Sequence, residues 1–462
     1  MSYQLRDYQS NLISIVLRHW KTGKRCQMLQ LPTGGGKTIC FARIIKILVD
    51  IGSKVLVVAH REELIRQAAD KIALMTDIEP GIIKSGIKPD YSRSIQVASI
   101  QSLTRRLNYC PQFELVVIDE AHHAAAKSYR QVLNHFPQSY VLGVSATPVR
   151  LDGSGFRDLF DELVCGASVK QLIEMGSLSH FKYFAAEQSM SLEGVRKKGG
   201  DYKTSDLIEA NPTESVAADC LKAYRDYLDG KQSVIFAVNV AQSQAIAASF
   251  SANNIPAAHL DGTSDSDTRL LTMAAFREGR IRVLSNCALF DEDLDIPGLD
   301  GVILARPTAS LGRYLQMVGR ALRPAPGKEY ASIIDLAGNW ERHGLPDDDR
   351  IWSLDGVKSF KRGKYTKLKR REDGQIEEIT IDLTPSDIQF QEINCCNLPQ
   401  KLDPLWQTEF DRLVEIQTSK RLKPAWIGFK LLELRAPLPV WKVAAKRLGY
   451  KPGWAWHQWH KC

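Results

Sequence analysis

The chain has 462 residues, of which 44% are hydrophobic and 25% are charged. These proportions are ordinary for a globular protein, and the length is sufficient for two or three domains that each bury a core. No apolar run reaches the roughly 18 residues that a membrane span requires, and the polar N-terminus lacks the apolar core of a signal peptide. We therefore expect a cytoplasmic protein without a membrane partner.

The net charge of +8 is unevenly distributed along the chain. Residues 420–462 are rich in Lys and Arg and contain a single acidic residue, Glu433. A local excess of this kind predicts a polyanion as partner. The nine cysteines form no C-x-x-C pair, which predicts reduced thiols rather than a zinc ribbon, with metal binding at Cys395 and Cys396 as the alternative.

Residues 31–38, with the sequence LPTGGGKT, form the first stretch that indicates chemistry. An apolar run precedes them and a helical pattern follows, so the glycines would lie between a strand and a helix N-terminus. Backbone N–H groups in such a loop can cradle phosphates, with Lys37 at the β- and γ-phosphates and the Thr38 hydroxyl on Mg²⁺. Leu31 stands where the general pattern has its first glycine, and a Gly-Lys-Thr turn that caps a helix is the alternative.

The first 165 residues alternate short apolar runs with helical patterns. The runs span 54–59, 95–98, 115–118 and 140–144. This rhythm predicts a doubly wound parallel sheet whose ligands bind beyond the carboxyl ends of its strands. Asp119 and Glu120 follow one run directly, so the first could hold Mg²⁺ and the second could orient an attacking water.

A second α/β pattern covers residues 211–345, with strand candidates at 233–237, 283–285, 301–305 and 332–335. Residues 166–210 are predicted to be an interdomain linker. Within it, 192–201 is charged and rich in glycine, which favours a solvated segment, with a phosphate-contacting loop as the alternative. Residues 346–462 are predicted to be a small, basic, mostly helical accessory region.

Residues 314–323 predict a helix with polar and apolar faces. Gln316, Arg320 and Arg323 fall on one face at i, i+4 and i+7. Leu315, Val318 and Leu322 supply a separate apolar stripe, which would leave the arginines directed at a ligand.

The accessory region carries a basic run at 357–371, followed by Asp373-Gly374, which predicts a hairpin turn. The basic run is either a solvated face or a nucleic-acid contact. Five of the nine tryptophans lie in 426–459. They are predicted to form a small core, and stacking on unpaired bases is compatible with that role.

In this order, residues 31–38, 119–122 and 145–148 resemble motifs I, II and III of superfamily 2 helicases of the DEAH type, and 316–323 resembles motif VI. The resemblance covers residues 3–340 and implies two RecA-like domains that bind ATP and Mg²⁺ between them. In that family the first glycine of motif I is usually absent, so Leu31 fits the pattern.

The resemblance also implies a role for each matching residue. The nucleotide contacts are Gln9 at the adenine, then Thr33, Gly34, Gly35, Gly36, Lys37, Thr38, Asp119, Glu120, His122, Asp295 and Gln316. Thr38 and Asp119 would hold the metal. The catalytic residues are Glu120, Lys37, Arg320 and Arg323. Ser145 and Thr147 would relay the nucleotide state.

Nucleic acid is the partner that the resemblance implies, with DNA favoured over RNA by analogy. The predicted contacts are Arg61, Ser99, Gln101, Asn239, Lys361, Arg362, Lys442, Lys446 and Arg447. Asp291 and Asp293 stand where relatives carry Thr and Gly in motif V. Because added carboxylates repel phosphate, they predict weakened coupling between ATP and nucleic acid.

Within the superfamily, residues 198–202 and 335–344 resemble RadD-type bacterial and phage repair helicases. The expected protein is a monomeric DNA helicase or translocase that acts on branched or single-stranded DNA, with a single-strand-binding or repair protein as a further partner. An RNA helicase and a DNA-annealing protein with a weakened motor are the alternatives.

Overall fold

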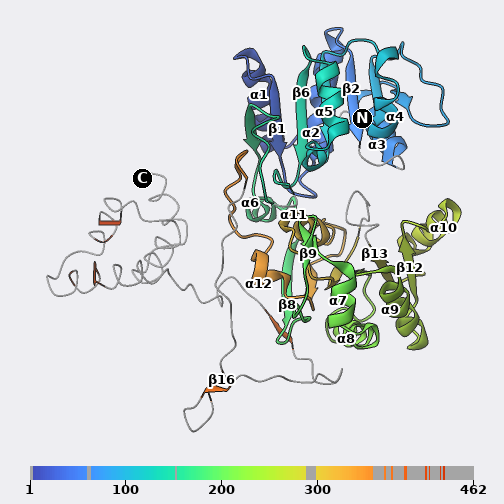
Figure 1. Cartoon of the computed structure of the whole chain (residues 1–462), viewed down its shortest axis with the longest axis vertical. Helices are drawn as coiled ribbons and strands as arrows, with labels where there is room; N and C mark the ends of the chain where they lie inside the picture. The colour runs from blue at the N-terminus through green and yellow to red at the C-terminus, as the bar shows by residue number, and fades with distance from the viewer. Residues whose placement is uncertain are drawn as a thin grey trace. The chain divides into compact units, whose positions relative to one another are not determined.

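The computed structural model describes residues 4–59, 64–150, 153–287 and 298–356, together with short pieces between 369 and 431. The chain divides into two compact units, residues 1–392 and 393–462. The first unit contains two large sheets, each with helices packed against it (Figure 1). The fold is described here for that unit.

The first sheet has seven parallel strands in the order β3-β4-β2-β5-β6-β1-β7. The strands are β1 (Cys26–Gln30), β2 (Val55–Ala59), β3 (Gly81–Ile83), β4 (Ile95–Ser99), β5 (Leu115–Asp119), β6 (Tyr140–Ser145) and β7 (Glu162–Cys165). The four predicted apolar runs are confirmed as β2, β4, β5 and β6. They are almost fully buried because helices cover both faces of the sheet.

Alternate residues along the strands pack on opposite sides of this sheet. Val55 and Val57 of β2 share one core with α1 (Asp7–Lys21), α2 (Lys37–Asp50) and α3 (Leu64–Thr76). Leu56 and Val58 share another core with α4 (Ile100–Thr104) and α5 (Lys127–His135). The first domain is therefore doubly wound, as the sequence predicts.

The second sheet has the order β12-β13-β11-β14-β15-β8-β18, parallel except at β18. Its strands are β8 (His180–Ala186), β11 (Ser233–Ala237), β12 (Ala257–Asp261), β13 (Val283–Cys287), β14 (Gly301–Ala305), β15 (Tyr330–Asp335) and β18 (Phe390–Glu392). Its helices are α8 (Thr213–Tyr227), α9 (Val240–Ala252), α10 (Ser266–Arg277), α11 (Leu311–Gly319) and α12 (Asn339–His343). The four strand candidates of this domain are confirmed, and a core beneath α8 and α9 covers one face.

The prediction of an interdomain linker at 166–210 is wrong. The segment contains α6 (Val169–Glu174), β8, β9 (Lys197–Lys198), β10 (Asp201–Tyr202) and α7 (Thr204–Ala210). β8 pairs with β15 along its length, so it belongs to the second sheet. Its partner is about 150 residues away in the sequence, and Lys182 interrupts its apolar pattern, which is why the periodicity does not reveal it.

Residues 345–356, which we call the return strap, pack against the first domain and correct the boundary predicted at 346. Leu354 is buried in the first-domain core. Its carbonyl accepts hydrogen bonds from the backbone N–H of Phe156 at 2.7 Å and of Arg157 at 3.0 Å, and the Arg157 guanidinium pairs with Asp355. The return strap therefore ties the end of the second domain to the first.

In the accessory region, β16 (Lys369–Arg370) and β17 (Ile376–Glu377) pair antiparallel on either side of Asp373-Gly374, which confirms the predicted pairing. Other predictions for this region lie outside the described residues: Lys361, Arg362, Lys442, Lys446, Arg447, Cys395, Cys396 and the tryptophans of 426–459. Among the described helices, none has both the length and the apolar character needed to cross a bilayer.

Candidate active site

The glycine loop connects β1 to the first turn of α2, as predicted. Gly34 and Gly36 have φ angles of +83° and +88°, in the left-handed region that disfavours other residues. A Cβ at Gly36 would also collide with Gln9 Nε2. The loop can therefore bend its backbone N–H groups inward at the start of α2, the arrangement that binds phosphate.

Gln9 lies against this loop from the first turn of α1. Its side chain is only 2% exposed, and its Oε1 accepts a hydrogen bond from Arg6 N at 3.0 Å. The neighbouring Tyr8 hydroxyl donates to Gly35 O at 2.8 Å. These contacts bring Gln9 to the phosphate loop, and its contact with adenine stays a prediction.

Lys37 and Glu120 form a buried ion pair at the carboxyl ends of β1 and β5. Lys37 Nζ donates to Glu120 Oε1 at 2.8 Å. Burial opposes the charged carboxylate, but the Lys37 ammonium and then the His122 hydrogen bond outweigh it and hold the pKa of Glu120 below its usual value. Glu120 is also in the left-handed region, with φ +46°, and its N–H donates to Asp119 Oδ1. The carboxylate is thus ionised and held at a fixed position.

A chain of polar contacts, which we call the relay, leads from Glu120 to the turn after β6. His122 Nδ1 lies 3.2 Å from Glu120 Oε2 and 3.3 Å from Ser145 Oγ. Ser145 Oγ donates to Thr147 O at 3.0 Å and accepts from Thr147 N at 3.1 Å. With the Ser145 hydrogen directed at Thr147 O, a hydrogen on His122 Nδ1 would face both the Glu120 and the Ser145 oxygens. His122, predicted as a nucleotide contact, thus lies in this relay.

The relay ends at helix α11 of the second domain. A Cβ built on Gly312 would lie 2.9 Å from Thr147 Oγ1, so helix and turn are in close contact. Further along α11, a Cβ on Gly319 would lie 2.6 Å from Thr33 Cβ of the glycine loop. Both close approaches require glycine in α11. The nucleotide loop and the relay therefore meet the same helix.

The predicted helix 314–323 ends early. α11 stops at Gly319, Arg320 caps it, and Arg323 lies in the following turn, so the three polar residues do not share one helical face. Gln316 and Arg320 are 6% and 5% exposed, and Leu315 is only partly buried, unlike Val318 and Leu322. The Arg323 Cγ nevertheless lies 3.6 Å from a Cβ built on Gly34, which brings this turn to the glycine loop.

Lys328 holds the turn that carries Arg323, and no sequence pattern predicts this role. Its Nζ donates to the carbonyls of Leu299 at 2.6 Å, Arg323 at 2.9 Å and Ala321. Burial lowers the pKa of Lys328 to about 8. A single lysine in a Pro- and Gly-rich turn carries no periodic signal, so only the fold identifies it as the support of Arg323.

Of the residues in the two domains that are predicted to contact nucleic acid, some cap helices, one is exposed, and others lie outside the described residues. Ser99 is fully buried and its Oγ accepts from Ser102 N as the N-cap of α4, which argues against contact of this side chain with nucleic acid. Asn239 caps α9 by accepting from Gln242 N at 2.7 Å. Gln101 is exposed on α4. Arg61, Asp291, Asp293 and Asp295 lie outside the described residues.

No cluster of metal-binding His, Cys, Asp or Glu occurs among the described residues. The described cysteines, Cys26, Cys40, Cys110, Cys165, Cys220 and Cys287, are free thiols, as predicted.

Both domains match known protein families. Residues 2–150 match the family "Type III restriction enzyme, res subunit", and residues 217–325 match "Helicase conserved C-terminal domain". In a solved structure, a putative HsdR subunit fragment of a type I restriction enzyme from Vibrio vulnificus YJ016 has the same fold. It has a TM-score of 0.60 and 21% sequence identity over 75% of this chain and 67% of that chain.

Three curated proteins resemble the chain in sequence. A 51.5 kDa protein of Lactococcus phage (isolate 7-9) is 31% identical over 70% of this chain and 68% of its own length. The putative ATP-dependent helicase IRC3 of Saccharomyces cerevisiae is 30% identical over 72% of this chain, which spans about half (51%) of the yeast protein. The DNA 3'-5' translocase XPB2 of Sulfurisphaera tokodaii is 27% identical over 69% of this chain and 79% of its own length.

The two parallel-sheet domains bring together the glycine loop, Asp119-Glu120 and the turn that carries Arg320 and Arg323, which we call the arginine turn. This combination defines an ATP-hydrolysing enzyme with helicase architecture. The chain belongs to the superfamily 2 helicases.

Proposed function

We propose that the chain is an ATP-driven motor that moves along DNA. The observation that carries this proposal is the relay, which joins the nucleotide loop of the first domain to helix α11 of the second. A motor needs a mechanical connection of this kind, because ATP hydrolysis in one domain must change its contact with the other.

The loop and its neighbours fit ATP. The left-handed glycines and the α2 N-terminus suit the phosphates, and Lys37 lies where it can reach them. Mg²⁺, held by Thr38 and Asp119, would neutralise charge on the β- and γ-phosphates. A γ-phosphate that attracts Lys37 would release Glu120 from its ion pair, and this carboxylate, with its lowered pKa, would orient and deprotonate the attacking water.

Arg320 and Arg323 would act as the arginine finger and the γ-phosphate sensor. A guanidinium fork matches the transferring phosphoryl group, and such a finger contributes about 10³–10⁵ in rate in other enzymes. The contact between Arg323 and the glycine loop supports this assignment. Gln316 is assigned to the same nucleotide surface.

DNA is the proposed track, because one relative in sequence is named a DNA 3'-5' translocase. The DEAH-type motif assignment, the RadD-type assignment and a role in DNA repair are part of this proposal. Asn339 of the RadD-like stretch holds the loop after β14: its Oδ1 accepts from Thr308 N, and its Nδ2 donates to Arg306 O.

The test is a translocation assay on DNA and RNA of the same length. Displacement of a triplex-forming strand or of a fork strand by the unmodified chain, with ATP, supports the proposal. The Glu120→Gln variant serves as the control: it should still bind nucleotide, because the glycine loop and Lys37 are kept, and should displace neither strand. Stimulation of ATP hydrolysis by RNA alone would overturn the choice of DNA. Binding and strand annealing without displacement would show the weakened motor that Asp291 and Asp293 predict.

A further inference from the structure

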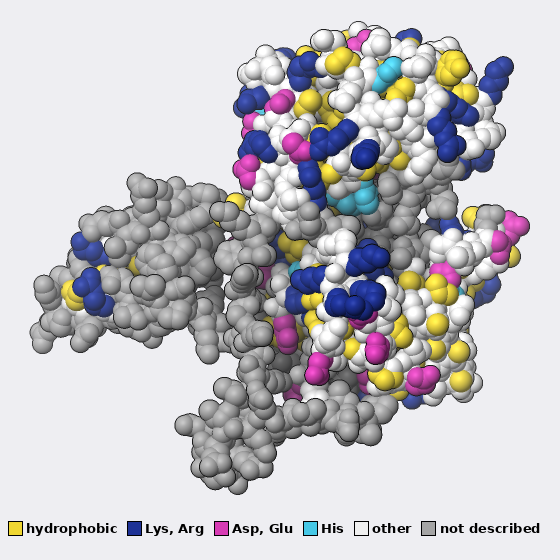
Figure 2. Space-filling model, viewed as in Figure 1, with side chains coloured by type: hydrophobic (Ala, Val, Ile, Leu, Met, Phe, Trp, Pro, Cys, Tyr) yellow, Lys and Arg dark blue, Asp and Glu magenta, His cyan; other side chains and the backbone are white. Residues whose placement is uncertain are grey.

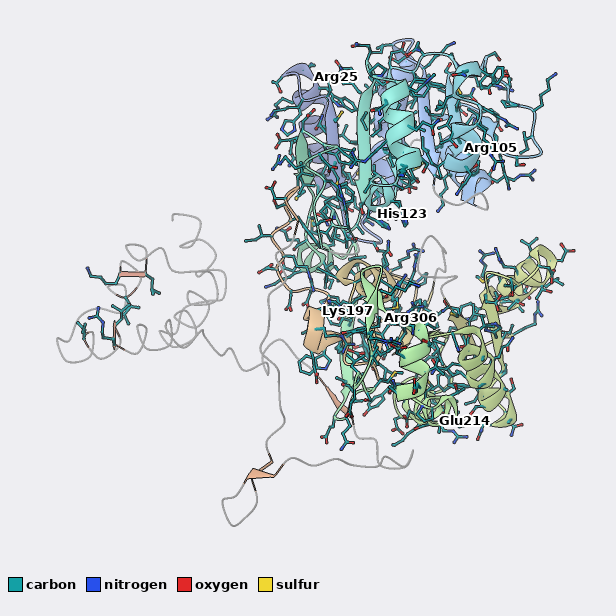
Figure 3. All side chains as sticks on the ribbon, viewed as in Figure 1. Arg25, Arg105, His123, Lys197, Glu214 and Arg306 are labelled. Atoms are coloured by element: carbon teal, nitrogen blue, oxygen red, sulfur yellow. The ribbon has the colours of Figure 1, made fainter. Side chains whose placement is uncertain are left out.

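The β9–β10 hairpin projects two lysines from the second domain. Gly199 and Gly200, with φ angles of +62° and +87°, make its turn, and Lys197 and Lys198 are exposed on β9. Figure 2 shows Lys and Arg side chains gathered where β9 lies in Figure 1. Figure 3 labels Lys197 and Arg306 in this same region.

The two lysines have different surroundings from the other basic residues of the hairpin. Arg196 and Lys203 both pair with Asp206. Neither Lys197 nor Lys198 forms an ion pair with any residue that the structure describes, and Lys197 Nζ lies 5.5 Å from the Tyr202 ring centroid. The tip of the hairpin thus presents positive charge that the described protein does not neutralise.

The base of the hairpin is fixed by a buried carboxylate. Asp201 is 8% exposed and accepts hydrogen bonds from Thr308 Oγ1 at 3.0 Å and from Ala309 N at 2.7 Å. It also pairs with Arg313 in the first turn of α11. Burying a carboxylate is costly unless it is paired and hydrogen-bonded, so these contacts hold hairpin and helix together.

Arg313 follows Gly312, the residue that touches Thr147 of the relay. Asp201 and Thr147 therefore contact neighbouring residues of one helix, Arg313 and Gly312. A displacement of the hairpin would act on the helix segment that contacts Thr147 of the relay.

We propose that the β9–β10 hairpin binds the phosphate backbone of the nucleic acid and that Asp201 transmits this contact to α11. This inference rests on the proposed function and adds a contact site to it. Lysines at a glycine turn suit phosphate rather than base edges, so the contact should be independent of sequence. Asp201 is a positioning residue, because it contacts α11 and not the nucleic acid.

The first test measures the salt dependence of binding to single-stranded DNA. The double variant Lys197→Gln/Lys198→Gln should flatten the plot of log K against log salt by about 1.4, because each phosphate contact contributes roughly 0.7. The matched control is Lys46→Gln/Lys222→Gln, which removes two lysines from exposed pairs on α2 and α8 and should retain the parental slope. Equal slopes in both double variants would overturn the hairpin proposal.

A second measurement needs no substitution. Acetylation of the unmodified chain with and without DNA, read by mass spectrometry, should show protection of Lys197 and Lys198 but not of Lys222. Equal modification of Lys197 and Lys198 in the two states contradicts the proposal. Absence of any salt-dependent binding by the unmodified chain would instead refute the proposed function itself.

The transmission step has its own readout. Asp201→Asn should retain the parental salt slope and lower the maximal stimulation of ATP hydrolysis by DNA several-fold. A misfolded protein would lose both the salt slope and the stimulation of ATP hydrolysis. A parental slope with reduced stimulation therefore identifies a loss of transmission. If Asp201→Asn kept the parental stimulation, Asp201 would not transmit the contact to α11. The phosphate contact of the hairpin would then be tested by the salt-slope measurement alone.

Discussion

The two sheet domains have similar architecture but assemble their functional residues in different ways. In the first domain, the glycine loop, Asp119-Glu120 and Ser145 lie at the carboxyl ends of strands β1, β5 and β6, which are adjacent in the sheet. In the second, Lys328 holds the turn 320–323 from a few residues further along the chain, and Asp201 and Asn339 hold the loop after β14 from distant segments. The first site is thus built by strand order, and the second by side-chain hydrogen bonds to loop backbone, some local and some from distant segments.

The two ways of building a site suit different tasks. A site built on strand ends is rigid and suits the binding of a phosphate chain. A turn supported by a few polar contacts changes position at lower cost, which suits a sensor that must respond to nucleotide and nucleic acid. Substitutions in either domain, or where the two touch, should therefore have different effects.

The largest effect is expected from Lys37→Ala in the first domain. It removes the ammonium that lies beside Glu120, so ATP hydrolysis should fall by about 10²–10³-fold, the cost of losing a single donor to a developing charge. ATP hydrolysis rates under saturating ATP provide the measurement. Lys46→Ala, on the exposed side of the same helix, is the control and should keep the parental rate.

In the second domain, Arg320→Lys tests the arginine turn. The charge is kept, which protects the fold at this buried position, but the planar fork is lost. We expect hydrolysis to fall about 10²-fold while nucleotide affinity stays within a few-fold of the parent. Affinity measured with a non-hydrolysable analogue separates the two effects. A parental rate would exclude Arg320 from the hydrolysis step.

His343 predicts a pH dependence for the folding of the second domain. Burial holds its pKa at about 4, below the 6.5 of a free histidine, and it contacts Thr308 O at 2.9 Å. The unfolded chain therefore binds a proton first as pH falls. His343 should stabilise the fold fully above pH 6.5, and about 3 kcal/mol should be lost between pH 6.5 and 4.

Urea denaturation at several pH values, followed by tryptophan fluorescence, measures this loss. The His343→Gln variant is less stable at neutral pH and should show a flatter pH profile. Identical profiles for the two proteins would mean that His343 does not titrate differently in the folded chain.

The smallest effect is expected where the domains touch. A methyl group at Gly312 would lie 2.9 Å from Thr147 Oγ1, so Gly312→Ala should displace the turn by a few tenths of an ångström. We expect DNA stimulation of hydrolysis to fall about three-fold, equivalent to roughly 0.6 kcal/mol. Gly262→Ala, where the added methyl meets no atom within 4 Å, is the matched control. A parental stimulation in Gly312→Ala would show that the relay does not pass through this contact.

The sequence predicted the first domain better than the second for a physical reason. Buried parallel strands read as continuous apolar runs, and phosphate loops need glycines at fixed positions, so both leave local patterns. β8 leaves no such pattern because its pairing partner is distant, and the charged, glycine-rich sequence around Asp201 predicts a solvated segment although the structure has a polar network there. The end of α11 was missed because its side-chain pattern continues beyond Gly319, whereas the lysine that fixes the following turn has no pattern.

The same reasoning explains the outcome for individual residues. Gln9, Lys37, Glu120 and Ser145 lie in the predicted neighbourhood because each is tied to a strand or helix end. Ser99 and Asn239, predicted to contact nucleic acid, cap helices in the structure. A side chain that caps a helix has the same sequence signature as a polar residue exposed at a strand end.

The most direct test of the account is a titration of single-stranded DNA into the unmodified chain, with the ATP hydrolysis rate measured at two salt concentrations. We predict that the rate rises to a plateau and that the half-saturating DNA concentration increases at the higher salt, because phosphate contacts release counterions. A hydrolysis rate that does not change with DNA at either salt concentration would contradict the coupling of the two domains.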